Sequence, residues 1–261
     1  MTRVGSRILT LNGKGEYMIT WKLLTDKGMR DHNEDMIGSR QIGNRYCFVL
    51  ADGLGGHGKG EVASRLVVNE ILAEFETYAT AEEFLKRALL RAQTALRQEQ
   101  EAMNCSSEMK TTVVCLVVDE KQMQWAFCGD SRLYYIYKNK IRQRTIDHSV
   151  PQVLALSKQI KEKDIRFHED RNRLLRVLGT EDNGKQMFEI MPPVARKGKQ
   201  KFLMCSDGFW EYIFEKDMEK LLKTSKTSEE WIQQMQKAVL ENGRGHDMDN
   251  YSAIAVWVDE K

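Results

Sequence analysis

Proline is scarce in this sequence, and long apolar runs are absent from it. Only 3 of the 261 residues are proline, which excludes a proline-rich linker between domains. No apolar stretch approaches the roughly 20 residues of a membrane-spanning helix, and the N-terminus lacks the apolar run of a signal peptide. We therefore expect a cytoplasmic protein without membrane contact, and the length suits one large domain.

The chain also lacks an excess of charge of either sign. Its 40 lysines and arginines against 38 aspartates and glutamates give a formal net charge of +2. Nucleic-acid-binding domains are usually strongly basic, so this balance predicts no nucleic-acid partner. The 5 cysteines include no Cys-x-x-Cys pair, and the histidines form no His-x-x-x-His. Zinc spacing is therefore absent, and we expect free, buried thiols in a reducing compartment.

Short runs rich in Val, Ile, Phe, Tyr and Trp, bounded by Gly, Asp and Asn, predict nine strands. They cover residues 18–23, 45–51, 111–119, 122–128, 132–137, 140–145, 187–190, 201–205 and 253–258. The connections at 120–121 and 138–139 are too short for a crossover helix, so the strands that they join must be antiparallel.

Two long helices are predicted between the strands. The first covers about 61–78, with its apolar residues on one face. The second follows Thr80, whose side chain can cap the helix while Glu83 completes a capping box. A later helix starts near Thr227 in the same way. Because strands and helices do not alternate strictly, we expect an α+β fold of antiparallel sheets covered by helices, not a doubly wound parallel sheet.

Two segments stand apart from this pattern. Residues 1–16 are polar and aperiodic, and we interpret them as a leader, frayed or adding a strand, before a single domain over 17–261. Residues 149–180 are charged and weakly periodic, which is typical of a mobile flap over a site. The cations within 158–176 could attract phosphoprotein surfaces, although a solvated face is the simpler interpretation.

Aspartates stand at the ends of four apolar runs. Asp52, Asp130 and Asp207 follow such runs, and Asp249 precedes the last strand. Each alone is typical of a turn. Strand ends that converge on one sheet edge would bring the four together, and their pKa values would rise unless a cation compensates. Hard divalent ions that prefer oxygen ligands, Mg²⁺ or Mn²⁺, are the natural compensation.

Seven short motifs follow one another along the chain. They are Arg30-Asp31-His32-Asn33-Glu34-Asp35, Asp52-Gly53-Leu54-Gly55-Gly56-His57, Gly129-Asp130-Ser131-Arg132, Asp147-His148-Ser149, Leu178-Gly179, Cys205-Ser206-Asp207-Gly208-Phe209-Trp210 and Asp249-Asn250-Tyr251-Ser252. One such motif is a weak signal, but seven in order are specific. Together they resemble the motifs of bacterial members of the PP2C (PPM) family of serine/threonine protein phosphatases, from about Thr25 to the C-terminus.

The resemblance implies a fold, a reaction and partners. The fold is a four-layer αββα sandwich, two antiparallel sheets flanked by antiparallel helix pairs. The reaction is hydrolysis of phosphoserine and phosphothreonine in proteins by a metal-bridged hydroxide, in a single step without a phosphoenzyme. Two Mn²⁺ or Mg²⁺ ions would be the cofactors, with a third in bacterial members. Phosphoproteins, such as the substrates of a cognate serine/threonine kinase, would be the partners of a monomeric enzyme.

The resemblance also assigns metal ligands residue by residue. Asp52 would bridge two ions, and the carbonyl of Gly53 would bind one of them. Asp207 and Asp249 would hold the second ion, and Asp130 with Asp207 a third. Glu34 would reach a metal-bound water, which Asp35 would support.

Arg30 and His57 would act on the substrate. Arg30 would clamp the phosphate, because its fork can bind two oxygens; the alternative is an exposed ion pair with Glu34. Animal members carry His directly after the Asp-Gly pair, where this chain has Leu54. His57 could give the leaving group its proton instead. A metal-bound water could do the same, and His57 could simply cap the glycine-rich turn.

Three other interpretations compete with this one. A pseudophosphatase would keep the fold as a phosphoprotein-binding regulator, but it should lack metal ligands, and Asp52, Asp207 and Asp249 are present. A phosphohydrolase of small phosphoesters would be separated by comparing phosphopeptides with nucleotides. Residues 53–58 also satisfy G-x-G-x-x-G, but a second helix follows instead of a parallel strand, which argues against a dinucleotide site.

Overall fold

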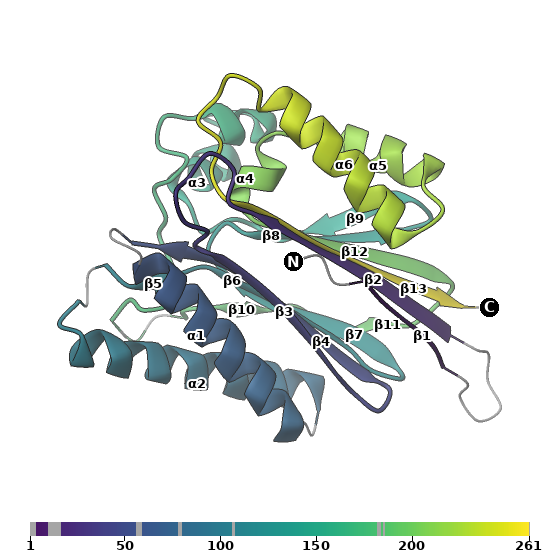
Figure 1. Ribbon diagram of the computed structural model, residues 1–261, viewed down its shortest axis with the longest axis horizontal. Helices are drawn as coiled ribbons and strands as arrows, with labels where there is room; N and C mark the ends of the chain where they lie inside the picture. Colours follow the sequence, from purple (N-terminus) through teal and green to yellow (C-terminus); the bar gives the residue numbers. More distant parts are fainter. Residues whose placement is uncertain are drawn as a thin grey trace.

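The computed structural model describes residues 4–9, 17–55, 59–77, 80–105, 108–181, 184 and 186–260. Its strands form two antiparallel sheets that lie face to face, with helices on the outside (Figure 1). Sheet A has the order β1-β2-β13-β12-β8-β9. These strands are β1 (Val4–Leu9), β2 (Tyr17–Asp26), β13 (Tyr251–Glu260), β12 (Lys199–Cys205), β8 (Arg132–Tyr137) and β9 (Lys140–Arg144).

Sheet B has the order β10-β7-β6-β4-β3, with β11 added to β7 and β5 to β4. These strands are β10 (Glu189–Ile190), β7 (Gln122–Cys128), β6 (Val113–Val118), β4 (Arg45–Leu54), β3 (Asp35–Ile42), β11 (Val194–Ala195) and β5 (Lys110–Thr111). The hairpins predicted at 120–121 and 138–139 are confirmed as the antiparallel pairs β6–β7 and β8–β9.

A pair of helices covers the outer face of each sheet (Figure 1). Helices α1 (Lys59–Glu74) and α2 (Ala81–Ala102) lie on sheet B, and α5 (Glu215–Thr224) and α6 (Ser228–Asn242) lie on sheet A. Shorter helical segments are η1 (Phe75–Thr77), α3 (Val150–Leu156), η2 (Glu162–Phe167) and α4 (Asp207–Trp210). The predicted αββα sandwich is confirmed. None of the helices in the described ranges is long and apolar enough to cross a membrane.

The caps predicted for two helices are present. The side chain of Thr80 accepts a hydrogen bond from the amide of Glu83, and that of Thr227 accepts one from the amide of Glu230, at 3.3 and 3.0 Å. Each bond satisfies an amide that has no partner within its helix, so these local sequences fix where the helices begin.

Three apolar layers hold the sandwich together, one between the sheets and one under each helix pair. Strand β6 shows how one strand serves two of them. Its odd-numbered residues pack toward α1 and α2, and its even-numbered residues pack between the sheets. Because successive side chains point to opposite faces, a strand buried on both faces has an uninterrupted apolar sequence.

Several elements were not predicted from the sequence, namely β3, α5 and the short α3, η2, α4 and β11. Strand β3 is an edge strand with mostly half-buried residues, so it lacks an apolar signature. Helix α5 buries only Met218 and Leu222 of its 10 residues. In the region interpreted as a leader, β1 pairs with β2, while residues 1–3 and 10–16 lie outside the described residues.

Candidate active site

The inward faces of both sheets end in polar residues at one end of the sandwich. In β4, Tyr46, Phe48 and Leu50 point between the sheets, and Asp52 continues their row because side chains repeat every two residues. Asp35, the first residue of β3, pairs directly with Asp52 across the ladder. Sheet B therefore places two carboxylates side by side where the apolar layer stops.

Sheet A meets these carboxylates with hydroxyl groups. Ser206, directly after β12, donates from its Oγ to Oδ2 of Asp35 at 2.8 Å, and the same Oγ accepts from the amide of Ser252 at 2.9 Å. Asp35 is 6% exposed, and its other oxygen, Oδ1, has no hydrogen-bond partner within the described ranges. A polar link thus joins the two sheets, and it leaves one buried acceptor oxygen free.

The other predicted aspartates surround this link. Asp207 begins α4 and accepts a 2.6 Å hydrogen bond from the amide of Gly208. Asp130 follows β7 and is 5% exposed, and its carbonyl accepts from Nε1 of Trp210 at 3.1 Å. Asp249 lies two residues before β13. Strand ends from both sheets therefore bring the predicted carboxylates together.

The carboxylates raise one another's pKa. Burial raises the pKa of Asp52 well above its usual range, and the charges of Asp207, Asp35, Asp130 and Asp249 raise it further. Burial, with the charge of Asp249 added, raises the pKa of Asp207 to about 6. Burial raises the pKa of Asp35 to about 7, and the neighbouring hydroxyl groups of Ser252 and Ser206 offset part of this rise. The mutual repulsion is what a bound cation would relieve.

Arg30 lies in the connection between β2 and β3, beside these groups. Its Nε and a terminal nitrogen donate to the two oxygens of Asp249 at 3.1 and 3.2 Å, and its other terminal nitrogen donates to Asp247 at 3.1 Å. The alternative predicted for it was an ion pair with Glu34, whereas these partners are the aspartates before β13. Its side chain is 44% exposed, so part of the guanidinium faces solvent.

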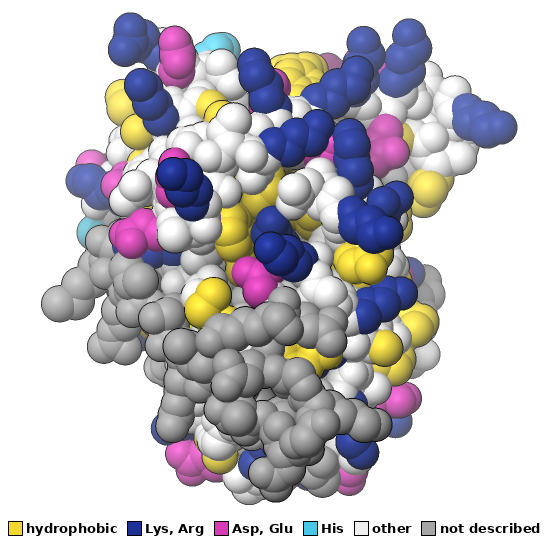
Figure 2. Space-filling model, turned by 90° about the vertical axis from the view of Figure 1, so that its right-hand side faces the viewer, with side chains coloured by type: hydrophobic (Ala, Val, Ile, Leu, Met, Phe, Trp, Pro, Cys, Tyr) yellow, Lys and Arg dark blue, Asp and Glu magenta, His cyan; other side chains and the backbone are white. Residues whose placement is uncertain are grey.

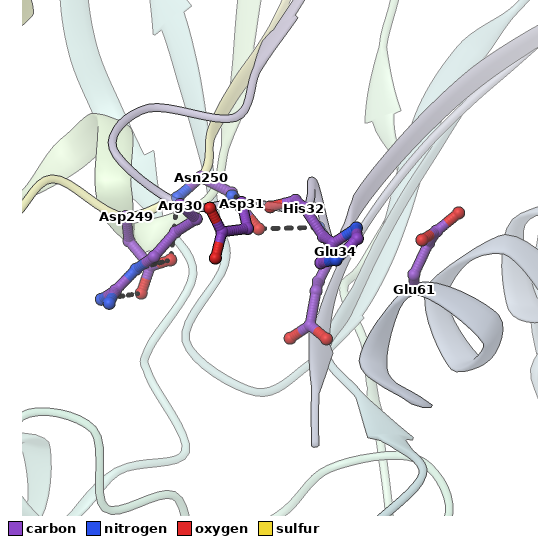
Figure 3. A pocket seen from close by; sticks show the side chains of 7 residues that line it. All are labelled: Arg30, Asp31, His32, Glu34, Glu61, Asp249 and Asn250. Atoms are coloured by element: carbon purple, nitrogen blue, oxygen red, sulfur yellow. Dashed lines mark hydrogen bonds and ion pairs between the residues drawn. The ribbon is translucent and has the colours of Figure 1, made fainter. Parts of the chain in front are cut away.

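A hollow of about 630 Å³ opens in front of Arg30. Figure 3 shows the guanidinium beside Asp249, with Glu34 and Glu61 farther along the hollow, at the start of β3 and on α1. Burial raises the pKa of Glu34, and Asp249 and Glu61 add to the effect. The hollow is thus lined by one guanidinium and several carboxylates, a composition that suits a phosphate only when cations are added.

The end of β4 approaches the start of α1 closely. A Cβ on Gly53 would lie 2.1 Å from the carbonyl oxygen of Gly60 and 2.7 Å from that of Glu34. Glycine at this position is therefore required by packing, and it brings the start of α1 against the carboxylate cluster. His57, predicted as a candidate general acid, lies outside the described residues.

Within the described ranges, no three His, Cys, Asp or Glu side chains are arranged to hold one metal ion by themselves. The donors present are carboxylate and carbonyl oxygens, and Asp249 is engaged by Arg30. Mg²⁺ and Mn²⁺ suit such a site, because ions of this type take oxygen ligands and Mg²⁺ in particular keeps several waters. The donor chemistry fits hard divalent ions, with water completing the shell.

Asn250 positions the site, a role that the sequence analysis missed. Its side-chain Nδ2 donates to the carbonyls of Lys27 and His32 at 2.9 and 2.8 Å, and its Oδ1 accepts from the backbone amide of Glu34 at 2.7 Å. These bonds fasten the connection that carries Arg30 and Glu34 to the start of β13. The motif Asp249-Asn250 was recognised, but the partners lie more than 200 residues away in the chain, so no local signal indicates them.

Some motif residues support the fold instead of lining the hollow. Arg132 and Asp147 form a buried pair with hydrogen bonds of 3.0 and 2.7 Å. Gly179 has a φ of 90° and packs against Gln100. These residues hold together the strands and loops around the site.

Comparison with known proteins agrees with this geometry. A family model described as "Protein phosphatase 2C" matches residues 28–252. The chain belongs to the protein phosphatase 2C family. It is 32% identical over 214 residues to the serine/threonine phosphatase stp of Listeria monocytogenes serotype 4b (strain F2365), covering 79% of this chain and 84% of the relative. Its enzyme class is that of a protein-serine/threonine phosphatase.

Solved protein phosphatase 2C structures superpose on nearly the whole chain. The phosphatase Stp1 from Staphylococcus aureus is 31% identical, with a TM-score of 0.79 over 90% of this chain and 93% of that one. The catalytic domain of PstP, in complex with two manganese ions, has a TM-score of 0.79 at 22% identity over 94% of this chain and 100% of that one, and this likeness concerns the fold.

Proposed function

We propose that this protein phosphatase 2C hydrolyses phosphoserine and phosphothreonine in proteins with the help of two divalent ions, Mn²⁺ or Mg²⁺. The observation that carries the proposal is the cluster of Asp35, Asp52, Asp130 and Asp207, whose pKa values are raised by burial and mutual repulsion. A solved relative of the same fold is described in complex with two manganese ions, which supports the choice of cofactor.

The metal ligands would come from both sheets. Asp52 and the carbonyl of Gly53 would serve from sheet B, and Asp207 and Asp249 from the side of sheet A. Asp130 would share a third ion with Asp207. The free Oδ1 of Asp35 and the carboxylate of Glu34 would hold water around the ions. When bound, the ions would supply positive charge to the phosphate dianion and an activated water as nucleophile.

Arg30 would bind the phosphate through its fork. At present the fork holds both oxygens of Asp249, which is the geometry that a phosphate with two free oxygens also satisfies. In the complete site Asp249 would turn toward an ion and Arg30 toward the substrate. The exchange needs only side-chain movement, because the hydrogen bonds of Asn250 hold the backbone that carries Arg30.

The leaving serine or threonine oxygen needs a proton, and we assign its donor to His57 or to water in the site. The substrates would be phosphoproteins, the targets of a cognate serine/threonine kinase. A monomer can carry out this reaction, because both groups of proposed metal ligands belong to one chain.

The test is hydrolysis of a phosphothreonine peptide by the purified protein with EDTA, with Mg²⁺ and with Mn²⁺. Asp207→Ala should abolish turnover, and Glu101→Ala, which removes an exposed carboxylate on α2, should not. Turnover that is indifferent to EDTA would contradict the metal role. Turnover of nucleotides without phosphopeptides would indicate a small-molecule phosphohydrolase, and folded protein inactive on both would indicate a binding protein.

A further inference from the structure

A second hollow, of about 570 Å³, opens beside α4. Its walls come from three places in the chain: the segment around η2, the connection from α4 to α5, and the region after α6. The residues that matter here are Phe167, Phe214, Tyr212 and His246, together with Arg166 and Arg171. None of them lines the hollow in front of Arg30.

The second hollow adjoins the carboxylate cluster. Glu211, on its wall, follows Asp207 by four residues, which is roughly 6 Å along a helix. The two carboxylates interact: burial raises the pKa of Glu211 to about 8, and the charge of Asp207 contributes. A second link comes from the region after α6, where His246 on the wall precedes Asp249 by three residues in the sequence. A peptide held at the metal site would therefore pass close to this hollow.

Four aromatic rings line the second hollow, beside four charged side chains and Asn242. Phe167 and Phe214 have ring centroids 6.3 Å apart, and Tyr212 and His246 have centroids 6.0 Å apart. Phe167 is 71% exposed. A single exposed ring needs no explanation, but two ring pairs gathered at one concave surface are typical of a binding site for an apolar group.

The two arginines on the wall already have carboxylate partners, while Asp217 adds an exposed carboxylate. Arg166 pairs with Glu215 at 3.2 Å and lies over the ring of Phe214 at 4.2 Å. Arg171 pairs with Glu211 at 3.1 Å. Both guanidiniums would repel a cationic guest, and neither needs an anionic one. Contact with the rings would therefore contribute most to the binding free energy, because it removes their apolar area from water.

We propose that the second hollow binds a large apolar or aromatic side chain of the phosphoprotein substrate, one to three residues from the phosphorylated residue. The distance sets the register, because an extended chain spans about 3.3–3.6 Å per residue and the gap from Asp207 to Glu211 is roughly 6 Å. This inference rests on the proposed function and gives it a sequence preference.

The experiment uses phosphothreonine peptides in an alanine background, with one phenylalanine moved through the three positions on either side. At one position, phenylalanine should raise kcat/KM on the order of tenfold over the all-alanine peptide. In Phe167→Ala, the ratio of kcat/KM for the phenylalanine peptide to kcat/KM for the all-alanine peptide should fall below about two. Leu156→Ala is the matched control, since Leu156 is 64% exposed in α3 but does not line the hollow; it should keep the full ratio.

Several outcomes would overturn the subsite. They are equal kcat/KM for all peptides, a phenylalanine preference that survives in Phe167→Ala, and a stronger preference for arginine than for phenylalanine. If no phosphopeptide is hydrolysed with Mn²⁺, the proposed function fails instead. The subsite is then decided by fluorescence anisotropy of the same peptides, where equal affinity of the phenylalanine and alanine peptides would refute it.

Discussion

The two ends of the sandwich handle charge in opposite ways. At one end, carboxylates from both sheets are withdrawn from water and raise one another's pKa. At the other end, where β12 begins, lysine and arginine side chains gather on the surface, most densely on the upper half of Figure 2. Lys138, Lys197 and Lys199 are examples, and all three are exposed.

The difference concerns solvation. Exposed like charges keep their hydration and cost the fold little. Buried like charges lose hydration and repel each other through a medium of low dielectric constant. The carboxylate end therefore opposes folding unless something compensates, and this cost identifies it as the functional end. The net charge of +2 does not show the contrast, because it sums the charges of the whole chain.

Asp52→Asn should show the largest effect. It removes one charge from the centre of the cluster and, in the proposed site, a metal ligand. We expect phosphopeptide turnover to fall on the order of a thousandfold, while the thermal midpoint of the metal-free protein at pH 8 rises because repulsion is relieved. Loss of activity together with loss of metal-free stability would mean that Asp52 is held there for structure.

Arg30→Ala should have the next largest effect. The fork in front of the hollow is the cation that pairs with Asp249, and we expect kcat/KM for phosphopeptides to fall about a hundredfold. Arg30→Lys keeps the charge but not the fork and should recover only part of the loss. Full activity in the lysine variant would show that charge alone matters.

Metal-free stability should depend on pH with an unusual sign. The folded pKa values of Asp207 and Asp35, about 6 and about 7, lie above the ordinary value of about 3.9 for an unfolded chain. The folded state therefore binds more protons than the unfolded state. The stabilisation that these two groups contribute is fully present below about pH 4 and is lost as the pH rises through 6 and 7.

Urea unfolding in EDTA at pH 5, 6, 7 and 8 measures this effect. We expect the free energy of unfolding to fall across the series by a few kcal/mol at most, and to fall less in Asp35→Asn. Saturating Mn²⁺ should remove the decline, since an ion that binds only the folded state stabilises it. A free energy that rises with pH in EDTA would contradict the assigned shifts.

A substitution at the basic end, where β12 begins, should have the smallest effect on turnover and stability. Lys197 is exposed and contacts only the ring of Tyr137, at 5.5 Å, among the interactions that the structure describes for its side chain. Lys197→Ala should leave kcat/KM within about twofold and the free energy of unfolding within about 0.5 kcal/mol. A tenfold loss of turnover would show that the distal end takes part in catalysis and would end the contrast.

Local patterns explain what could be predicted from the sequence. The apolar run of β6 and the cap at Thr80 depend on neighbours in the chain, so both were predicted. Strand β3 and helix α5 bury little apolar surface, so periodicity could not indicate them. Asp52, Asp130 and Asp207 were found because each follows a conspicuous apolar run, and Asp249 because it stands just before the last one.

Long-range contacts explain what could not be predicted. The pairing of Asp35 with Asp52, the bond from Ser206 to Asp35 and the clamp made by Asn250 each need the register of the finished sheets. The ion pair of Arg30 with Asp249 likewise joins residues 219 positions apart. Those contacts decide the geometry of the site.

The hydrogen bond from Ser206 to Asp35 has a consequence for assembly. It joins the two sheets at the point where their carboxylates meet, so neither sheet with its own helices contains the site. A folding intermediate in which one half has formed would be compact and yet inert. Two fragments of the chain, each supplying part of the cluster, would regain activity only by complementation. Phosphatase activity would then measure the fraction of molecules in which the two halves have docked.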